Sequence, residues 1–574
     1  MSRKYIVLAH NSAYRHTRRS SPLSGAVKTF SYKPLSGTQI RLLRIKSANG
    51  RVRCQLRTVY LSECPRYHAL SYVWGNHMDA QVAEVNGAPF LITYNLYEAL
   101  KTFRDLPPNG LLSAPFWLWV DAICINQNDT SEKSRQIPRL GDIYSAADRV
   151  IIWLSSYIGW TSFEEQMIHQ GLFCPQGNTQ WLFYGVGNKS SLTKKEFTEL
   201  SLLLELFTGH MWFRRTWTVQ EAVLARKSPV FLHIFEHSIG TATLDLLHGM
   251  ARKTKYFGKS RILQQWATMR KWARDPHRSA DLEVRDPGSM ILILLIYTRM
   301  RTSSIPHDRI YGLYCLLQVM NTRFPDFQPP VVDYSLPYGQ VCTDITRLII
   351  EHTRNSNIIT TASVGHRVPG APTWVSDFYE CLRLKVHLGV LDSWDCPEIS
   401  DDGQVLMITA NITDSCEVIV PLPGDNFERG NHNQVLDHIE DIERAIIRPI
   451  AVRRSLDQDV LWSALLGSAA FESFVQVRLP GFDSAEWLDY QQLERVGTYL
   501  DDHFFATKDG WVGCCGEGAP CQAGDTICLR HDEAPIIIRR VDDFDTYEVI
   551  GKVDSHEDEL NRPVGKAFSR IQLI

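Results

Sequence analysis

The stretch Trp117-Leu-Trp-Val-Asp-Ala-Ile-Cys-Ile-Asn-Gln127 decides the fold of the first part of this chain. From Trp117 to Ile123 it is apolar except at Asp121, and such a short run is typical of a strand that is buried on both faces of a sheet. A second run of this kind, Val150-Ile-Ile-Trp-Leu154, follows a segment with helical spacing. Strands that alternate with helices predict an α/β domain, which we place at residues 31–235.

The residues on either side of this stretch add strands to the same sheet. Ile40–Ile45, Val52–Val59 and Tyr67–Tyr72 have the length and pattern of strands. Asn86-Gly87 lies between two further short strands and predicts a hairpin, because these two residues accept the positive φ values of a type I′ turn. Asn95 is predicted to be the N-cap of the next helix.

Three helices are predicted in the rest of the domain. The first covers Asp129–Tyr144 and contains Pro138, which should kink it because proline lacks the backbone N–H that the helix needs. The second begins at a capping box of Thr193 and Glu196 and continues through Phe207. The third covers Thr216–Arg226.

Beyond the α/β domain the pattern changes twice. Residues 236–400 are predicted to be mostly helical, and residues 401–574 form a mixed region that ends in a small β-rich module. Residues 1–30 contain six lysines and arginines and no acid, so we interpret them as a disordered basic tail, with a mitochondrial leader as the alternative. Three structured parts suit a chain of 574 residues, because single cores stop growing near about 300 residues.

Composition limits the classes of function. Hydrophobic residues make up 44% and charged residues 22% of the chain, as in folded globular proteins. The net charge of -3 gives no general reason to expect binding to nucleic acid or to an anionic membrane. The most apolar run, Met290–Tyr297, is less than half the roughly 20 residues of a membrane helix, so we expect a buried element there. The thirteen cysteines show no framework spacing and are expected to be reduced, as in a cytoplasmic protein.

The candidate site residues lie where predicted strands end. Ser71, Trp74 and Gly75 close the strand that begins at Tyr67, and Asp121 follows the apolar residues 117–120. Ligands of open α/β sheets gather at the carboxyl ends of strands. Trp74 is either a site residue or a core anchor, and Asp121 is either a site residue or a cap for nearby backbone donors. Cys124, among apolar residues, is interpreted as a core residue.

The third candidate segment is a helix that carries an acid. Trp217 and Glu221 are four residues apart and should lie on one helical face. A carboxyl group beside a large aromatic ring can be desolvated, which raises its pKa and marks a site candidate. The alternative is a surface carboxylate paired with Arg214 or Arg215.

Two other kinds of site were considered. A group near the C-terminus has metal-ligand chemistry but lacks the paired C-x₂-C spacing of structural zinc sites, so no metal site is predicted; its members are Cys514, Cys515, Cys521, Cys528 and His531. No signature of nucleic-acid recognition accompanies the basic and aromatic residues near the motifs, and no phosphate-binding G-x₄-G-K-[ST] loop is present.

Three motifs together resemble the fungal heterokaryon-incompatibility (HET) domain. They are Tyr67-His-Ala-Leu-Ser-Tyr-Val-Trp-Gly75, Trp117–Gln127 and Arg214-Arg-Thr-Trp-Thr-Val-Gln-Glu221. Segments after the domain, including Pro306-His-Asp-Arg-Ile-Tyr-Gly-Leu313, resemble those that follow it in many members of the family. Pro138 and the acid-free tail depart from the family pattern.

The resemblance implies a fold and a chemistry. HET domains are distantly similar to TIR domains, which have a flavodoxin-like α/β fold, and in TIR enzymes a glutamate four residues after a tryptophan serves cleavage of NAD. It therefore implies that Glu221 is the catalytic residue of an NAD glycohydrolase, with NAD as substrate and no cofactor. Ser71, Trp74, Gly75, Asp121 and Trp217 would bind the substrate.

The resemblance also implies a biological role and leaves its mechanism open. It points to an effector of fungal self/non-self recognition and regulated cell death that acts through self-association or another incompatibility protein. One alternative is a module that only oligomerises or binds partners, without catalysis. The other is a regulator whose HET domain has degenerated.

Overall fold

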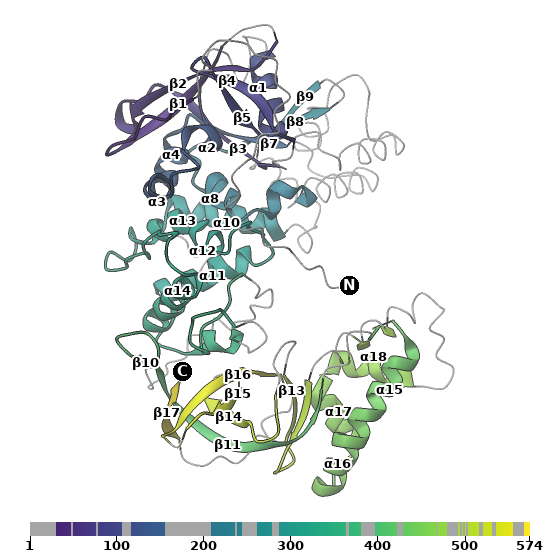
Figure 1. Ribbon diagram of the computed structural model, residues 1–574. Helices are drawn as coiled ribbons and strands as arrows, with labels where there is room; N and C mark the ends of the chain where they lie inside the picture. The colour runs from purple at the N-terminus through teal and green to yellow at the C-terminus, as the bar shows by residue number, and fades with distance from the viewer. Residues whose placement is uncertain are drawn as a thin grey trace, which may run out of the picture.

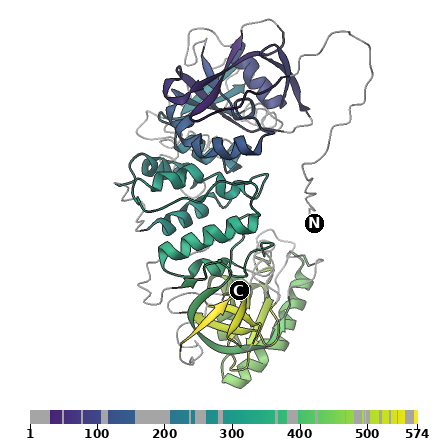
Figure 2. The ribbon, with the colours of Figure 1, turned by 60° about the vertical axis from the view of Figure 1, so that its left-hand side comes forward.

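A computed structural model describes the chain from Phe30 to Ile574 with internal gaps. The gaps are residues 47–49, 76–78, 106–115, 155–207, 236–237, 244–260, 278–285, 363–366, 380–396, 422–426, 429, 467, 479–491, 494–495, 498–499, 501–502, 516–520, 531–534, 543 and 555–567. An α/β region, a helical region and a β-rich region follow one another along the long direction of the molecule (Figures 1 and 2). This confirms the predicted order of one α/β, one helical and one β-rich part.

The α/β region is built on a nine-stranded mixed sheet. In spatial order its strands are β5 (Ala88–Ile92), β4 (Gln81–Val85), β2 (Arg53–Tyr60), β1 (Gln39–Lys46), β6 (Trp117–Trp119), β3 (Tyr67–Tyr72), β7 (Arg149–Leu154), β8 (Val230–Phe235) and β9 (Ser238–Thr243). β6, β3, β7 and β8 run parallel, whereas β1 pairs antiparallel with β2 and with β6. All six residues of β3 are buried, so this strand lies at the centre of the fold.

Several predicted elements of this sheet are confirmed. The turn between β4 and β5 has Asn86 at φ 51° and Gly87 at φ 79°, as a type I′ turn requires. The predicted kink at Pro138 is also present, because α3 (Thr130–Gln136) and α4 (Leu140–Ala146) are separated by the 3-10 turn η3 (Ile137–Arg139). Asp129 caps α3 by accepting a hydrogen bond from the Glu132 N–H at 3.0 Å.

Two local predictions were wrong. The strand at Trp117 ends at Trp119, and α2 (Asp121–Cys124) begins at Asp121, inside the run Trp117–Ile123 that was predicted to be a strand. The backbone turns there because the Asp121 carboxylate accepts a hydrogen bond from the Ala122 N–H at 2.7 Å. Asn95 is not an N-cap: it lies inside α1 (Tyr94–Asp105), where its side chain accepts from the Trp153 indole and donates to the Val73 carbonyl.

The third motif forms a short 3-10 turn and a short helix. These are η4 (Met211–Arg214) and α8 (Thr218–Val223), which lies within the predicted 216–226. The expected helix that begins at Thr193 falls outside the described residues. All six residues of α8 are buried, so the helix packs inside the protein and not on its surface.

The middle region consists of helices that follow the α/β region and pack against its helices α4 (Leu140–Ala146) and α8. They are α10 (Arg261–Arg274), α11 (Pro287–Thr298), α12 (Asp308–Tyr311), α13 (Tyr314–Met320), α14 (Tyr338–Thr353) and the 3-10 turn η6 (Asn357–Thr361). The apolar run at Met290 belongs to α11, which is buried and capped by Asp286. None of the helices within the described residues is both long and apolar enough to cross a membrane.

The C-terminal strands form a closed ring. β11 (Leu406–Val420), β12 (His503–Thr507), β13 (Val512–Cys515), β16 (Thr546–Asp554), β15 (Ile536–Arg540) and β14 (Thr526–Arg530) pair in that order, and β14 pairs back to β11. β10 (Glu398–Ile399) and β17 (Ser569–Leu573) pair with β11. The helices α15 (His432–Ile442), α16 (Arg448–Arg454), α17 (Gln458–Leu466) and α18 (Ser468–Arg478) lie beside this ring (Figure 1).

The hydrophobic core is continuous across the regions. One cluster of buried side chains extends from the α/β sheet through the middle helices to the C-terminal strands, where it includes Ile408 and Cys528. Two smaller clusters fill the space between the ring and its helices and the interior of the ring. Because the α/β sheet and the middle helices share one core, the middle region can position residues of the third motif.

Candidate active site

The first and third motifs meet at Ser71, near the carboxyl end of β3. The Ser71 hydroxyl donates a hydrogen bond to Glu221 Oε2, and the Trp212 indole N–H donates to Ser71 Oγ at 2.7 Å. Ser71 is 1% exposed and Glu221 is 6% exposed. A relay therefore connects an indole of η4, a hydroxyl of β3 and a carboxyl of α8, and Glu221 is not a surface carboxylate.

The second motif joins the first through a tryptophan. The Trp74 indole N–H, just beyond β3, donates to Asp121 Oδ2 at 2.7 Å. Asp121 is the first residue of α2, so this bond connects the carboxyl ends of β3 and β6. One Asp121 oxygen accepts from the Ala122 N–H, in line with the interpretation as a partner of nearby backbone donors, and the other accepts from Trp74. Gly75, in the left-handed region at φ 77°, turns the chain away from the strand.

Arg215 is the cation of this group. Its guanidinium donates to the Tyr72 carbonyl at the end of β3. Burial raises the pKa values of Asp121, Glu221 and Asp308, and the positive charge of Arg215 opposes this rise in all three acids. Arg214, the neighbouring residue in the sequence, is exposed.

Burial dominates the electrostatics of Glu221. Burial raises the pKa of its carboxyl to about 7, and the Asp121 charge acts in the same direction. Arg215 and the hydrogen bonds from Ser71 and Tyr144 lower this pKa but do not offset the desolvation. Burial also raises the pKa of Asp121. A carboxyl group with a pKa near 7 can be either an acid or a base at neutral pH.

Trp217 points to a different partner from Glu221. It precedes α8, and its indole hydrogen-bonds to the Asp308 carboxylate. The Tyr334 hydroxyl donates to the same carboxylate at 2.7 Å. Burial raises the pKa of Asp308. Trp217 and Glu221 are four residues apart but have different partners. Trp217 binds the acid Asp308 on α12, whereas Glu221 on α8 binds Ser71.

The middle region also holds the backbone of the third motif. The Thr302 N–H donates to the Arg214 carbonyl at 2.5 Å, and the Thr216 N–H donates to the Thr302 carbonyl at 3.1 Å. The buried Arg301 donates to the Phe213 carbonyl at 2.7 Å and lies over the Trp266 ring. These contacts fix the turn between η4 and α8, which sets the positions of Arg215 and Glu221.

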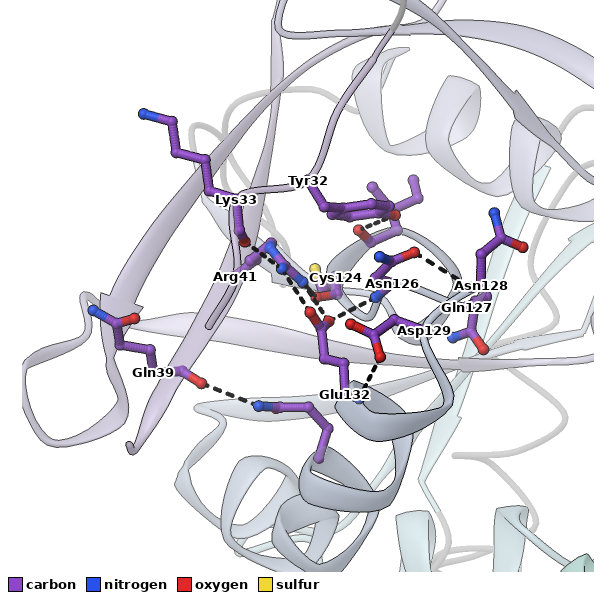
Figure 3. Close-up of polar contacts among 12 residues, drawn as sticks. Tyr32, Lys33, Gln39, Arg41, Cys124, Asn126, Gln127, Asn128, Asp129 and Glu132 are labelled. Atoms are coloured by element: carbon purple, nitrogen blue, oxygen red, sulfur yellow. Dashed lines mark hydrogen bonds and ion pairs between the residues drawn. The ribbon is translucent and has the colours of Figure 1, made fainter. Parts of the chain in front are cut away.

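A separate polar cluster fixes the loop after Asp121 (Figure 3). Arg41 and Glu132, each 2% exposed, form a bidentate ion pair at 2.6 and 2.9 Å. Arg41 also donates to the Cys124 carbonyl at 2.8 Å, and Glu132 accepts from the Asn126 N–H at 2.7 Å. The end of α2 is thus tied to β1 and α3. Cys124 is a buried core residue, as predicted, and burial raises the pKa of its thiol to about 12.

The structure brings the predicted site residues together and adds others to them. Ser71 is hydrogen-bonded to Glu221 and Trp74 to Asp121, and the Asp121 charge acts on Glu221; Gly75 follows Trp74, and Trp217 is directed toward Asp308. Sequence reasoning gave no site role to Trp212, Tyr144 or Asp308, and treated Arg215 only as a pairing partner. Asp308 lies in Pro306–Leu313, a segment noted for its resemblance but given no function.

Metal ligands do not gather in the part of the chain that the structure describes. Within those residues no three His, Cys, Asp or Glu side chains are arranged to hold a metal ion. His531, one of the five C-terminal residues considered for zinc, lies outside the described residues.

Comparisons with known proteins agree with this geometry. Residues 67–221 match the family model described as Heterokaryon incompatibility protein (HET), and these residues begin with β3 and end at Glu221. The chain is 39% identical over 140 residues to heterokaryon incompatibility protein 6, OR allele, of Neurospora crassa. That alignment covers 22% of this chain and 20% of the relative, so the similarity spans about a fifth of the relative's length. No solved structure matches the chain. Residues 67–221 of the α/β region, which include Asp121 and Glu221, therefore match the HET domain.

Proposed function

We propose that this protein is an effector of fungal heterokaryon incompatibility, in which recognition of a non-self partner leads to cell death. The HET domain and its similarity to a Neurospora crassa incompatibility protein support this role. We further propose that the protein acts by cleaving the nicotinamide–ribose bond of NAD, and that Glu221 is the catalytic residue. Assembly of several chains, or binding to another incompatibility protein, would switch this activity on.

One observation carries the chemical proposal: Glu221 is buried and bonded to Ser71 near the carboxyl end of a central parallel strand. Desolvating a carboxyl group costs free energy, and a buried acid with a pKa near 7 is typical of catalytic sites. The order of the parallel strands, β6-β3-β7-β8, is the order in which flavodoxin-like sheets begin, and such sheets bind ligands beside their first strand. β3 has that place here.

The reaction needs little more than one well-placed carboxylate. The bond between C1′ of the ribose and the ring nitrogen breaks, and its electron pair neutralises the pyridinium, so nicotinamide leaves as a neutral molecule. The ribose becomes oxocarbenium-like, and the Glu221 carboxylate stabilises that charge. Water then adds to C1′ and gives up a proton, which yields ADP-ribose.

The charge balance of the site favours a cationic reacting centre. Three acids, Asp121, Glu221 and Asp308, lie within electrostatic range of one arginine, Arg215. When all are ionised the group carries a net charge of about -2, by the sum of one cation and three anions. A pyridinium ring that enters such a site would stabilise the ionised form of the acids, as an opposite charge does.

The second candidate function is a HET module that only binds partners. The Glu221 carboxyl already has internal partners in Ser71 and Tyr144, so the relay could act as a structural clamp between β3 and α8. The two functions make different demands on Glu221. A clamp needs only a hydrogen-bond acceptor at this position, whereas catalysis needs a negative charge.

The test distinguishes the need for a negative charge at position 221 from the need for a hydrogen-bond acceptor. The purified full chain, concentrated to promote assembly, is incubated with NAD, and nicotinamide and ADP-ribose are quantified. Glu221→Gln keeps an acceptor for Ser71 but has no charge, and Glu221→Ala has neither. We expect both variants to lose NAD cleavage and to lose toxicity on inducible expression in fungal cells. Undiminished turnover in either variant would exclude Glu221 as the catalytic residue, and toxicity in Glu221→Gln without NAD loss would favour the partner-binding module.

A further inference from the structure

Three cysteine thiols converge inside the C-terminal ring of strands, far along the chain from the HET domain. They come from three elements: Cys416 from β11, Cys515 from the end of β13, and Cys521 from the turn before β14. Their exposed fractions are 1%, 0% and 7%, and all three belong to the small hydrophobic cluster that fills the ring. The Sγ atoms of Cys416 and Cys521 are 3.8 Å apart, in contact but not bonded.

The backbone holds Cys416 against the turn that carries Cys521. The Cys416 N–H donates to the Asp525 carbonyl at 2.7 Å, and the Gly524 N–H donates to the Cys416 carbonyl at 2.9 Å. The register of β11 shifts on both sides of Cys416, because the strand leaves β14 here and joins β12. The two sulfur atoms are therefore neighbours because of fixed backbone pairing.

The turn itself is braced by an acid. Asp525 is 2% exposed and accepts from the Gln522 N–H at 2.8 Å and from Arg539 at 2.8 and 2.9 Å. These bonds hold the turn from Cys521 to Asp525 against β11 and β15. Cys521, the most exposed of the three thiols, is thus the one that a small reagent reaches first.

The chemical surroundings single out the same thiol. The Cys521 sulfur is in contact with Cys416, and its hydrogen-bonding interactions with Cys416 and Cys515 lower the pKa of Cys521, which favours a thiolate there. The nearby His503 ring acts in the same direction. Burial and the shared hydrogen bonds raise the pKa values of Cys416 and Cys515, so they remain thiols. Such an arrangement pairs a nucleophilic sulfur with two potential resolving partners.

We propose that Cys521 and Cys416 form a redox-active thiol pair that a peroxide converts to a disulfide, with Cys515 as the alternative partner of Cys521. The Cys521 thiolate attacks one oxygen of hydrogen peroxide, the O–O bond breaks, and sulfenic acid and hydroxide form. The Cys416 thiol then displaces the hydroxyl group as water. Two thiols lose two electrons in total, and the peroxide is reduced to two molecules of water.

The experiment uses the reduced full chain, treated under argon with graded hydrogen peroxide and then quenched with a thiol-alkylating reagent. Peptide mapping by mass spectrometry identifies each oxidised cysteine. We expect the Cys416–Cys521 cross-link to be the first product, with Cys521 oxidised at least about tenfold faster than Cys514 or Cys528. These two cysteines are matched internal controls, because they lie in strands of the same ring but pack in other hydrophobic clusters. A dithiol reductant should restore the starting map.

Two variants sharpen the result. In Cys416→Ser we expect Cys521 to cross-link to Cys515 or to persist as a sulfenic acid that a dimedone probe captures. In Cys528→Ser the Cys416–Cys521 link should form as in the wild type. The wild-type map decides the question without any variant, so a folding failure leaves the test intact. The proposal is overturned if Cys521 reacts no faster than Cys514 and Cys528, or if no Cys416–Cys521 link forms at doses that oxidise the half-buried Cys64.

Discussion

Arg41 and Glu132 lie in the same α/β region as Arg215 and Glu221, and each arginine lies near a buried glutamate. The Arg41–Glu132 pair is one cation and one anion in bidentate contact, and backbone groups occupy their remaining hydrogen-bonding positions. Around Arg215, by contrast, three acids share one cation, and the carboxyl of Glu221 keeps a pKa near 7. The first cluster pairs each charge with an opposite one, whereas the second holds three acids near one arginine, and burial raises the pKa of each acid.

This contrast separates structure from chemistry within one fold. A complete buried pair gains nothing from a ligand, because every charge already has a partner. A cluster in which acids outnumber cations costs free energy to bury, and a bound cation would stabilise it. We therefore expect substitutions in the Arg41 cluster to act on stability and substitutions in the Arg215 cluster to act on activity and pH dependence.

The largest expected effect is on the complete pair. Arg41→Met should destabilise the protein by about 3–5 kcal/mol, because it leaves the Glu132 charge buried without a partner. Urea unfolding measures the change. Arg53→Met is the matched control, since Arg53 on the adjacent strand pairs with Glu84 at the surface, and its loss should cost less than about 1 kcal/mol. Equal effects of the two variants would show that burial of the pair does not matter.

The next substitution is expected to stabilise the protein and not to destabilise it. The folded state raises the pKa of Glu221 from 4.5 to about 7, so the protein has its full stability from this group below pH 4.5 and loses it as the pH rises through 7. Glu221→Gln removes the titrating group and should be more stable than the wild type by up to about 3 kcal/mol at pH 8. At pH 4 the two should be alike. Denaturant unfolding at both pH values measures this, and a variant that is less stable at pH 8 would support the structural clamp.

Ser71→Ala tests the relay between β3 and α8. It removes a hydrogen bond to a charged group and leaves the Trp212 indole without its acceptor, so NAD cleavage should fall about 10- to 100-fold. Nicotinamide release at saturating NAD is the measurement, with circular dichroism as the check on folding. Ser145→Ala on the exposed face of α4 should leave turnover unchanged. Unaltered cleavage in Ser71→Ala would remove Ser71 from the site.

The smallest effect sharpens the role of the shared cation. Wild-type cleavage should rise with pH to a plateau, with a midpoint near 7, because the ionised form of Glu221 is required. Arg215→Met removes the charge that lowers this pKa, so the midpoint should move up by about one pH unit or more. Exposed Arg214→Met is the control and should not move it. If Arg215→Met abolishes cleavage, the pH dependence of its stability reports the same shift.

The sequence predicted the parts of the fold that depend on local pattern. The hairpin at Asn86-Gly87, the buried strands at Tyr67 and Val150 and the break at Pro138 all depend on residues that are close in the sequence. Asp121 misled the prediction, because its carboxylate turns the backbone into a helix within a run that is otherwise typical of a strand. A side chain that bonds its own backbone overrides apolar patterning.

The candidate site was predicted in outline only. Ser71 and Glu221 are 150 residues apart, and the motif resemblance alone suggested that they meet. Trp212 and Asp308 carry no signal of their own, because an indole and a carboxyl group become site residues only through the neighbours that the fold gives them. Sequence spacing placed Trp217 and Glu221 together on one face but could not show that each binds a different partner.

The pairing of Thr302 with Arg214 and Thr216 has a consequence for how such proteins can be inherited. An exchange of segments near residue 243 would separate the three motifs from Arg301, Thr302 and Asp308. A chimaera made at that position would keep every motif of the domain yet lose the backbone support of the turn and the acid that holds Trp217. The smallest unit that can be transferred intact therefore extends through α12 to Tyr334, well past the last strand of the sheet.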